Sequence, residues 1–340
     1  MSNIYLIFII FFSFTNLNTF FEELWAEELG HNGTVTSLAL NKQATFLISG
    51  GHDGTVRLWN LREIGSMQYL LDYRGAFVDF TDAYPPREVM SVDIDQKGEL
   101  VVAGFRDRTV RIWSLNNDET TKVMRGHKGG VLAVSINPAS TLVASGGHEP
   151  VVRVWDLQTG AQIKVFEGHV GSVNSVKFTS DGMRVITGGQ DGVLRIWDVL
   201  SGGLIKELKP DCGVINGIAV SKRPIYFVAG CWEKAVLWKE PDGEPFVLPH
   251  GDLNWVASVD ISQDGKSLLT GDGKGVVRIW DAIEGKELNK FLGNEMSEVR
   301  SVILGPDQKL AISGGDDGIY MWRLGNDYRL LSGGDKKEIH

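Results

Sequence analysis

Short runs of alternating or continuous apolar residues recur along the chain, and each run has the length of a β-strand. Residues 173–198 show the pattern: the runs VNSVKF, RVITGG and VLRIW are separated by Ser-Asp-Gly and Gln-Asp-Gly. Such runs predict half-buried strands, and Asp-Gly predicts tight turns because Gly accepts positive φ. One three-stranded unit is too small to bury its apolar face alone, so it must pack against copies of itself.

Seven copies of this unit can be aligned by a Trp at the end of each third strand. These residues are Trp59, Trp113, Trp155, Trp197, Trp238, Trp280 and Trp322, at successive spacings of 54, 42, 42, 41, 42 and 42 residues. The first strand is expected to start 24 residues before the Trp in six units and 23 before it in the last. The predicted starts are Val35, Val89, Val131, Val173, Val214, Val256 and Val299. The constant internal length predicts an array of seven similar sheets.

Two dipeptides accompany this period. In the fourth unit, Gly168-His169 precedes the first strand and Trp197-Asp198 closes the third, and other units repeat one or both marks. A period near 42 with these dipeptides resembles the WD-repeat family. The resemblance implies an all-β fold, a seven-bladed β-propeller of four-stranded antiparallel sheets over residues 20–332. Residues 1–19 would then be an apolar N-terminal leader, and residues 333–340 a short polar tail.

The resemblance also implies a buried hydrogen-bonded set of His, Ser or Thr, an acidic residue and Trp in three units. The sets are His31, Ser49, Asp53 and Trp59; His127, Ser145, Glu149 and Trp155; and His169, Thr187, Asp191 and Trp197. A His between an acid and a hydroxyl, with an indole N–H as end donor, leaves no buried polar group unpaired. Hydrolase triads use the same residue types, but a nucleophile is needed only once, so the recurrence favours the structural interpretation.

The other four units depart from this pattern. Pro85 and Pro210 stand at the His positions of units 2 and 5, Glu295 stands there in unit 7, and Lys274 replaces the acid of unit 6. We expect these blades to depend more on apolar packing. An Arg two residues before the Trp in five units is expected to be a structural stripe, paired with acids on the next strand.

Composition limits the ligands and reactions that can be expected of the chain. The chain has 340 residues, a net charge of −9 and a pI of about 5.3, which argues against broad binding to nucleic acid. Cys212 and Cys231 form neither a disulfide framework nor a metal-ligand cluster, and we expect free thiols. With no phosphate loop, metal motif or unique acid-base pair, we expect no cofactor, no metal and no catalytic residue.

The N-terminus leaves alternatives open. Residues 4–14 are almost entirely apolar, a length that suits the core of a signal peptide better than a membrane span of about 20 residues. No Lys or Arg precedes them, and no cleavage site is evident. The segment is a signal peptide, a membrane anchor, or a leader on a cytoplasmic propeller. Either residues 21–29 or residues 328–331 could add the outer strand of the last blade, and we favour residues 21–29.

Propellers of this family generally present a ring-shaped face to other proteins, so the loops on that face are the candidate binding site. Two large aromatic residues from adjacent units, Trp232 and Trp255, are the predicted anchors. The other candidates are His52, Arg106 and His148 on the same face, and Phe80 and Tyr84 in an insertion at residues 75–88. The sequence thus predicts a non-catalytic scaffold for partner proteins within a multiprotein complex. The alternative is an exported or membrane-anchored propeller that binds a small molecule or glycan at its channel mouth.

Overall fold

The fold is a ring of seven antiparallel sheets, which we call blades 1 to 7 in chain order. The computed structural model describes residues 31–61, 88–116, 122–223, 225–239, 243–248, 255–292, 297–325 and 337–339. Within these ranges every regular element is a strand. Blade 1 has three described strands and each other blade has four.

Blades 1 to 4 contain the first fifteen strands. Blade 1 is β1 (Val35–Leu40), β2 (Phe46–Gly51) and β3 (Val56–Asn60). Blade 2 is β4 (Val89–Ile94), β5 (Leu100–Phe105), β6 (Thr109–Ser114) and β7 (Lys122–Arg125). Blade 3 is β8 (Val131–Ile136), β9 (Leu142–Gly147), β10 (Glu149–Asp156) and β11 (Gln162–Glu167). Blade 4 is β12 (Val173–Phe178), β13 (Arg184–Gly189), β14 (Leu194–Asp198) and β15 (Leu204–Leu208).

Blades 5 to 7 complete the ring. Blade 5 is β16 (Ile215–Val220), β17 (Tyr226–Cys231), β18 (Ala235–Lys239) and β19 (Pro245–Leu248). Blade 6 is β20 (Val256–Ile261), β21 (Ser267–Asp272), β22 (Val276–Asp281) and β23 (Lys286–Leu292). Blade 7 is β24 (Val299–Leu304), β25 (Leu310–Gly315), β26 (Gly318–Arg323) and β27 (Lys337–Ile339).

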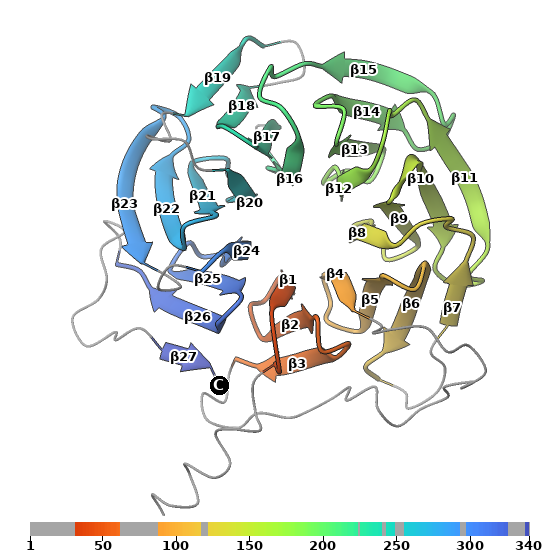
Figure 1. Cartoon of the computed structure of the whole chain (residues 1–340), viewed down its shortest axis with the longest axis horizontal. Coiled ribbons are helices and arrows are strands. Elements are labelled where there is room, and N and C mark those ends of the chain that lie inside the picture. The colour runs from red at the N-terminus through yellow and green to blue at the C-terminus, as the bar shows by residue number, and fades with distance from the viewer. Residues whose placement is uncertain are drawn as a thin grey trace, which may run out of the picture.

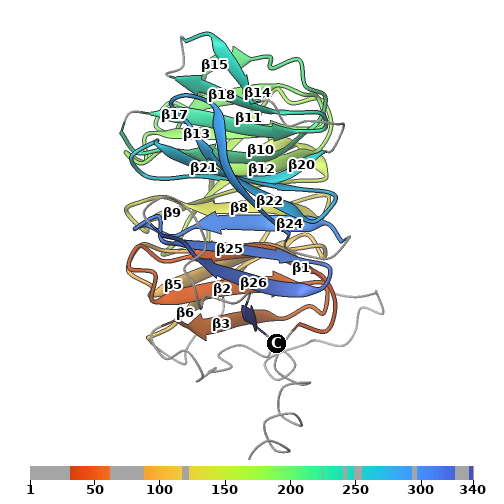
Figure 2. The ribbon, with the colours of Figure 1, turned by 90° about the vertical axis from the view of Figure 1, so that its left-hand side faces the viewer.

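The first strand of every blade lines a central channel, and the later strands lie progressively farther out (Figure 1). Seen from the side, the strands run between the two faces of the disc (Figure 2). The ring closes because β24 of blade 7 packs against β1 of blade 1. The chain is therefore a seven-bladed β-propeller, as the resemblance to the WD-repeat family implies.

Apolar packing between neighbouring blades makes up the core. Each of seven buried clusters is shared by two adjacent blades, and the Trp of each third strand packs toward the preceding blade. Trp155 of blade 3, for example, is 1% exposed and lies with Val110 and Met124 of blade 2. Each sheet thus buries its faces only because a neighbour covers them.

Hydrogen bonds along the channel join the blades a second time. Six serines in first strands accept a backbone N–H from the first strand of the next blade, at 3.0 to 3.3 Å. They are Ser37, Ser91, Ser135, Ser175, Ser258 and Ser301. Between blades 5 and 6 the amide of Asn216 donates instead to the Val256 carbonyl oxygen, at 3.2 Å. The channel between these strands has a volume of about 410 Å³.

Two carboxylates in the channel serve the same purpose as the serines. Asp93 accepts the N–H of Ile136 at 2.7 Å, and Asp260 accepts the N–H of Leu304 at 2.8 Å. Burial raises the pKa of both groups, for Asp260 to about 6, although Lys177 and the backbone donors oppose the shift. These carboxylates therefore link blades while sitting where their ionised form is disfavoured.

The structure corrects two details at strand level. The first strand of blade 5 begins at Ile215, one residue after the predicted Val214, because the segment from the end of its second strand to Trp238 is one residue shorter than in most blades. The outer strand of blade 7 is β27, which pairs with β26 through Ile339, Glu338 and Lys337. This place was predicted for residues 21–29, which lie outside the described residues, and residues 333–340 were predicted to be only a polar tail.

The described ranges contain no helix long and apolar enough to cross a membrane. The apolar residues 4–14 lie outside those ranges.

Replacing Asp260 with Asn should change how stability depends on pH. The folded pKa of about 6 lies above the ordinary value of 3.8, so the contribution of this carboxyl is greatest below pH 4 and falls as pH rises through 6. The free energy of unfolding of the wild type, minus that of Asp260→Asn, should decrease between pH 4 and 7 by on the order of 1 to 3 kcal/mol. Urea unfolding at several pH values measures this difference.

The control Glu167→Gln removes an exposed carboxyl from β11, and its stability should run parallel to the wild type across the same pH range. A parallel course for Asp260→Asn as well would show that the channel carboxyl does not titrate with a raised pKa.

Candidate functional site

All three predicted hydrogen-bonded sets are present in the structure. In blade 1, His31 Nδ1 lies 3.0 Å from an Asp53 oxygen, His31 Nε2 lies 2.7 Å from Ser49 Oγ, and Trp59 donates its indole N–H to the same hydroxyl at 2.8 Å. The corresponding distances are 2.5, 2.6 and 2.7 Å in blade 3, for His127, Ser145, Glu149 and Trp155. They are 3.1, 2.7 and 2.8 Å in blade 4, for His169, Thr187, Asp191 and Trp197.

The burial and protonation of the His residues favour a structural role for these sets. The side chains of His31, His127 and His169 are 1%, 0% and 1% exposed. Burial lowers the pKa of His127 and His169 because desolvation disfavours imidazolium. A neutral ring in blade 3 donates from Nδ1 to the carboxylate and accepts the hydroxyl proton at Nε2. Every donor of that set is then paired inside the blade.

The acidic members are held in their ionised form. Burial alone would raise the pKa of Asp53, but the hydrogen bond and charge of His31 outweigh it and hold that pKa well below its usual value. The pKa values of Glu149 and Asp191 are lowered despite burial, with Arg153 and the Val170 N–H respectively as the largest opposing causes. Because the pKa values of the three acids, and of His127 and His169, are lowered, the stability these groups contribute is present at neutral pH and is lost as pH falls.

The recurring Arg of the third strand also belongs to this structural layer. Arg111 and Arg195 contact the turn acids of their own blades, Asp107 and Asp191, at 2.5 and 2.6 Å. The predicted pairing with the next strand occurs as well in blade 4, where Arg195 donates to Glu207 at 2.8 Å. The stripe is therefore used for ion pairs within blades.

One position decides whether a blade can contain the His. In blade 1 the last residue of β2 is Gly51, and a Cβ there would lie 2.4 Å from His31 Nδ1. Blades 2, 5 and 6, which have no His, carry a side chain at the same register position. These residues are Phe105, Cys231 and Asp272, and all are fully buried. The space that the imidazole would take is thus filled from the second strand instead.

Each replacement supplies its own contact. The Phe105 ring lies 6.2 Å from the Trp113 ring and 4.3 Å below the guanidinium of Arg111. Asp272 accepts the N–H groups of Lys274 and Val276 at 2.9 and 3.0 Å, as well as a hydrogen bond from Arg278. Blade 6 therefore has a buried acid after all, two residues before the Lys274 position that the sequence pattern assigned to it.

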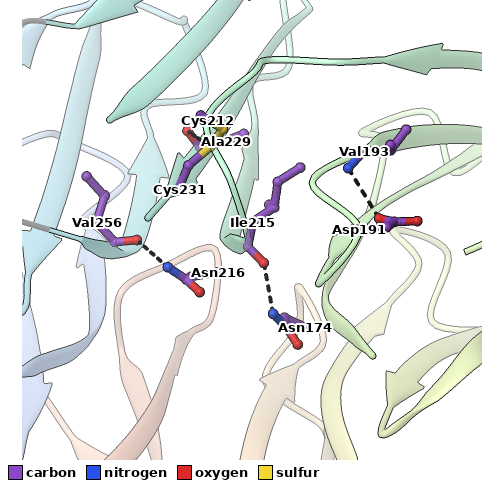
Figure 3. The surroundings of a disulfide bond; sticks show 9 residues. All are labelled: Asn174, Asp191, Val193, Cys212, Ile215, Asn216, Ala229, Cys231 and Val256. Atoms are coloured by element: carbon purple, nitrogen blue, oxygen red, sulfur yellow. Dashed lines mark hydrogen bonds between the residues drawn. A yellow bond between two sulfur atoms is a disulfide. The ribbon is translucent and has the colours of Figure 1, made fainter. Parts of the chain in front are cut away.

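In blade 5 the contact is covalent. Cys212, before the first strand, forms a disulfide with Cys231, and their Cα atoms are 5.6 Å apart (Figure 3). The expectation of free thiols was wrong, because Cys231 ends β17 beside the loop that carries Cys212. The disulfide joins the loop before β16 to the end of β17. In blade 4 the contact between His169 and Asp191 joins the corresponding segments. Both cysteines are buried and adjoin the loops of the predicted binding face.

Those loops form one face of the disc, which we call the rim face: the loops before each first strand and after each second strand. Backbone hydrogen bonds join the two loops of a blade, as in His52 N–H to Thr34, Arg106 N–H to Glu88 and His148 N–H to Gly130. His52, Arg106 and His148 therefore lie at equivalent places on this face. Phe80 and Tyr84 lie outside the described residues.

Trp232 and Trp255 meet on the rim face, between blades 5 and 6. Their ring centroids are 4.9 Å apart with the planes tilted by 51°. Trp232 is 52% exposed, whereas Trp255 is partly buried over Gly273, where a Cβ would lie 2.6 Å from its indole nitrogen. The pair borders a hollow of about 280 Å³. Its other lining residues are Asn216, Ala257, Glu298 and Arg300.

Asn216 and Arg300 were not predicted as site residues. Both are the second residue of a first strand, beside the channel mouth. The same position is apolar in other blades, as in Met90, Leu132 and Ala257, so the repeat pattern carries no signal that singles them out.

A family model described as WD domain, G-beta repeat matches residues 25–60, 82–114, 118–156, 160–198, 246–281 and 285–323, which together form more than half of the chain. The chain belongs to the WD-repeat family. The matches leave out residues 199–245, which include most of blade 5 of this WD-repeat propeller. That blade is the one in which the disulfide replaces the His and acid.

Curated relatives match over shorter regions. The chain is 33% identical over 110 residues to the human F-box-like/WD repeat-containing protein TBL1Y, covering 31% of this chain and 20% of that protein. It is 26% identical over 110 residues to human Transducin beta-like protein 3, covering 31% and 14%. It is 31% identical over 87 residues to a Xenopus laevis protein named p21-activated protein kinase-interacting protein 1-like, covering 26% and 20%. The matched part thus spans at most a fifth of each relative.

Two Thr→Val substitutions should show how much more stability the full hydrogen-bonded set contributes than a set without the His. Thr187 in blade 4 bonds both His169 and Trp197, whereas Thr270 in blade 6 bonds Trp280 and has no His beside it among the described residues. Thr187→Val leaves more buried polar groups unpaired, so it should lower the free energy of unfolding by about 1 to 3 kcal/mol more than Thr270→Val. Chemical denaturation measures both, and equal losses would contradict a special role for the His.

Removing the disulfide should lower stability in a non-additive way. The bond closes a loop with a sequence separation of 19 residues, for which chain entropy gives about 3 kcal/mol. Cys212→Ala, Cys231→Ala and the double variant should each lose nearly the same amount, since each removes the same bond. The measurement is denaturant unfolding of the oxidised protein. Single losses that add up to the double loss would indicate two independent packing effects and no shared bond.

Proposed function

We propose that this chain is a non-catalytic scaffold whose rim face binds other proteins. The Trp232–Trp255 pair is the observation that carries the proposal, because it leaves half of a Trp side chain in water at the mouth of the channel. Exposed Trp side chains in a hollow are the residues most often found as anchors of protein interfaces. A purely structural indole would be buried, as Trp238 and Trp280 are in the same two blades.

The surroundings of the pair support a preformed site. Trp232 N–H donates to the Val214 carbonyl oxygen, and Gly273 N–H donates to the Trp255 carbonyl oxygen. The disulfide holds Cys231, the residue before Trp232, to the loop before β16. Because the backbone on both sides is fixed, little conformational entropy is lost when a partner binds.

The remaining rim residues would form the polar edge of the interface. The Arg106 side chain is 63% exposed and forms an ion pair with Glu88, and His148 contacts Ser172. Exposed pairs of this kind contribute little affinity and mainly affect specificity and association rate. The name of the Xenopus relative describes an interaction with a protein kinase, which fits a protein-binding role in general.

The test compares rim variants of the full-length chain as bait. Trp232→Ala and the double variant with Trp255→Ala should lose captured proteins by a factor of about 30 or more, as expected for an anchor worth about 2 kcal/mol. Leu200→Ala is the matched control. Leu200 is 87% exposed and follows the third strand of blade 4, which the antiparallel order places on the opposite face.

Circular dichroism and thermal melting should show that each variant is folded. Unchanged capture by folded Trp232→Ala and by the folded double variant would refute the proposal. Equal losses with Leu200→Ala would show that the rim face is not the binding surface.

A further inference from the structure

The Trp pair lies beside an imbalance of charge. The Glu298 carboxylate is 14% exposed and accepts Arg300 Nη2 at 2.7 Å. The same guanidinium approaches Asp316, with Nε 3.6 Å from Oδ1, and Asp316 also accepts the Thr34 hydroxyl at 2.9 Å. Two carboxylates thus share one guanidinium, which leaves a net charge of about −1 at the hollow.

The loop that carries Trp232 does not supply the missing cation, because Glu233 offsets Lys234 there. Burial, and to a lesser degree the charge of Asp316, raise the pKa of Glu298 against the opposing effect of Arg300. The negative charge on Glu298 is therefore only partly compensated.

The indoles and Glu298 face the same hollow, so one ligand group can contact both. The Trp255 indole N–H lies close enough to the Glu298 carboxyl to oppose the rise in its pKa. Trp232 lines the same hollow and is more exposed than Trp255. Aromatic faces attract cations, and a carboxylate adds a charged acceptor.

We infer that the hollow between Trp232, Trp255 and Glu298 binds a basic side chain, Arg or Lys, presented by a partner protein. This inference rests on the proposed protein-binding function and names the chemistry of the contact. The basic group stacks against the exposed indole and pairs with Glu298, while its aliphatic stem covers apolar surface that is otherwise in water. An acidic chain of net charge −9 also favours approach of a basic segment.

The experiment titrates the full-length protein with four pentapeptides that are blocked at both ends and differ only at the central residue. The central residue is Arg, Lys, citrulline or Glu, so that citrulline keeps the shape of Arg without its charge. The Arg and Lys peptides should bind at least about tenfold more tightly than the citrulline and Glu peptides, by calorimetry at low salt, and should move the indole N–H signal of Trp232. Binding should weaken as salt is raised.

Variants locate the contact. Glu298→Gln keeps the shape of the side chain, removes its charge, and should abolish the preference for Arg over citrulline. Trp232→Ala should weaken binding of the Arg and Lys peptides alike. Glu167→Gln and Leu200→Ala, at exposed places outside the hollow, should change neither result.

Each other outcome overturns the inference. Equal binding of Arg and citrulline peptides, tighter binding of the Glu peptide, absence of binding at millimolar concentration, or a Glu298→Gln variant with an intact preference would each exclude a basic side chain as the ligand. Loss of partner capture in Trp232→Ala with full capture in Glu298→Gln would leave the scaffold function standing and reject only the basic contact. Unchanged capture in both Trp variants would reject the scaffold function, whatever the peptides show.

Discussion

The fold depends on the contact between the first strand of one blade and the first strand of the next. Each first strand is the edge of its sheet, and its free N–H groups face the channel, where they would otherwise lack a partner. A serine or aspartate of the preceding blade accepts one of them, as in Ser37 with Val92 and Asp260 with Leu304. These bonds fix the position of each blade relative to the next. The Trp of each third strand therefore packs against the preceding blade in the same way around the ring. The ring closes because the Leu38 N–H of blade 1 donates the equivalent hydrogen bond to the Ser301 hydroxyl of blade 7.

With the blades fixed at the channel, the loops of the rim face need a second constraint, and the chain uses different chemistry for it in different blades. In blades 1 and 4 the acid of the set holds the His and also accepts the N–H of the next residue, Asn32 or Val170. In blade 1 this arrangement requires Gly51 at the end of the second strand, where a Cβ would collide with the imidazole, and in blade 4 a Cβ on Gly189 would collide with the Ser172 carbonyl oxygen. Where the His is missing, that position is free to carry Phe105, Cys231 or Asp272, and each fills the space with a different interaction.

The sequence predicts the parts of this structure that repeat, because seven units show similar residue types at the same offsets. The period, the Trp positions and every predicted strand start except that of blade 5 follow from residues at fixed offsets. The three hydrogen-bonded sets follow from the family resemblance that those offsets carry. The parts that could not be predicted are the exceptions. Cys212 and Cys231 show as a pair only when the loop before β16 is seen beside the end of β17. Asp272 acts two residues from the expected place, and β27 pairs with β26 across an intervening segment with no repeat signal. Arg300 and Asn216 belong to the hollow through the geometry of the ring alone.

The candidate site lies between blades 5 and 6, which both lack the His, and this location has a structural reason. A His and an acid tie down both rim loops of a blade, and the residues beside them must fit that hydrogen-bonded set. In blade 5 the disulfide holds the loops together below the surface, and the residue after Cys231 is an exposed Trp. In blade 6 the buried Asp272 organises the turn from two residues further back, and Gly273 leaves room above it for Trp255. Blades 5 and 6 thus both depart from the pattern and both direct a large aromatic side chain toward the rim face, with the contacts that hold their loops lying beneath it.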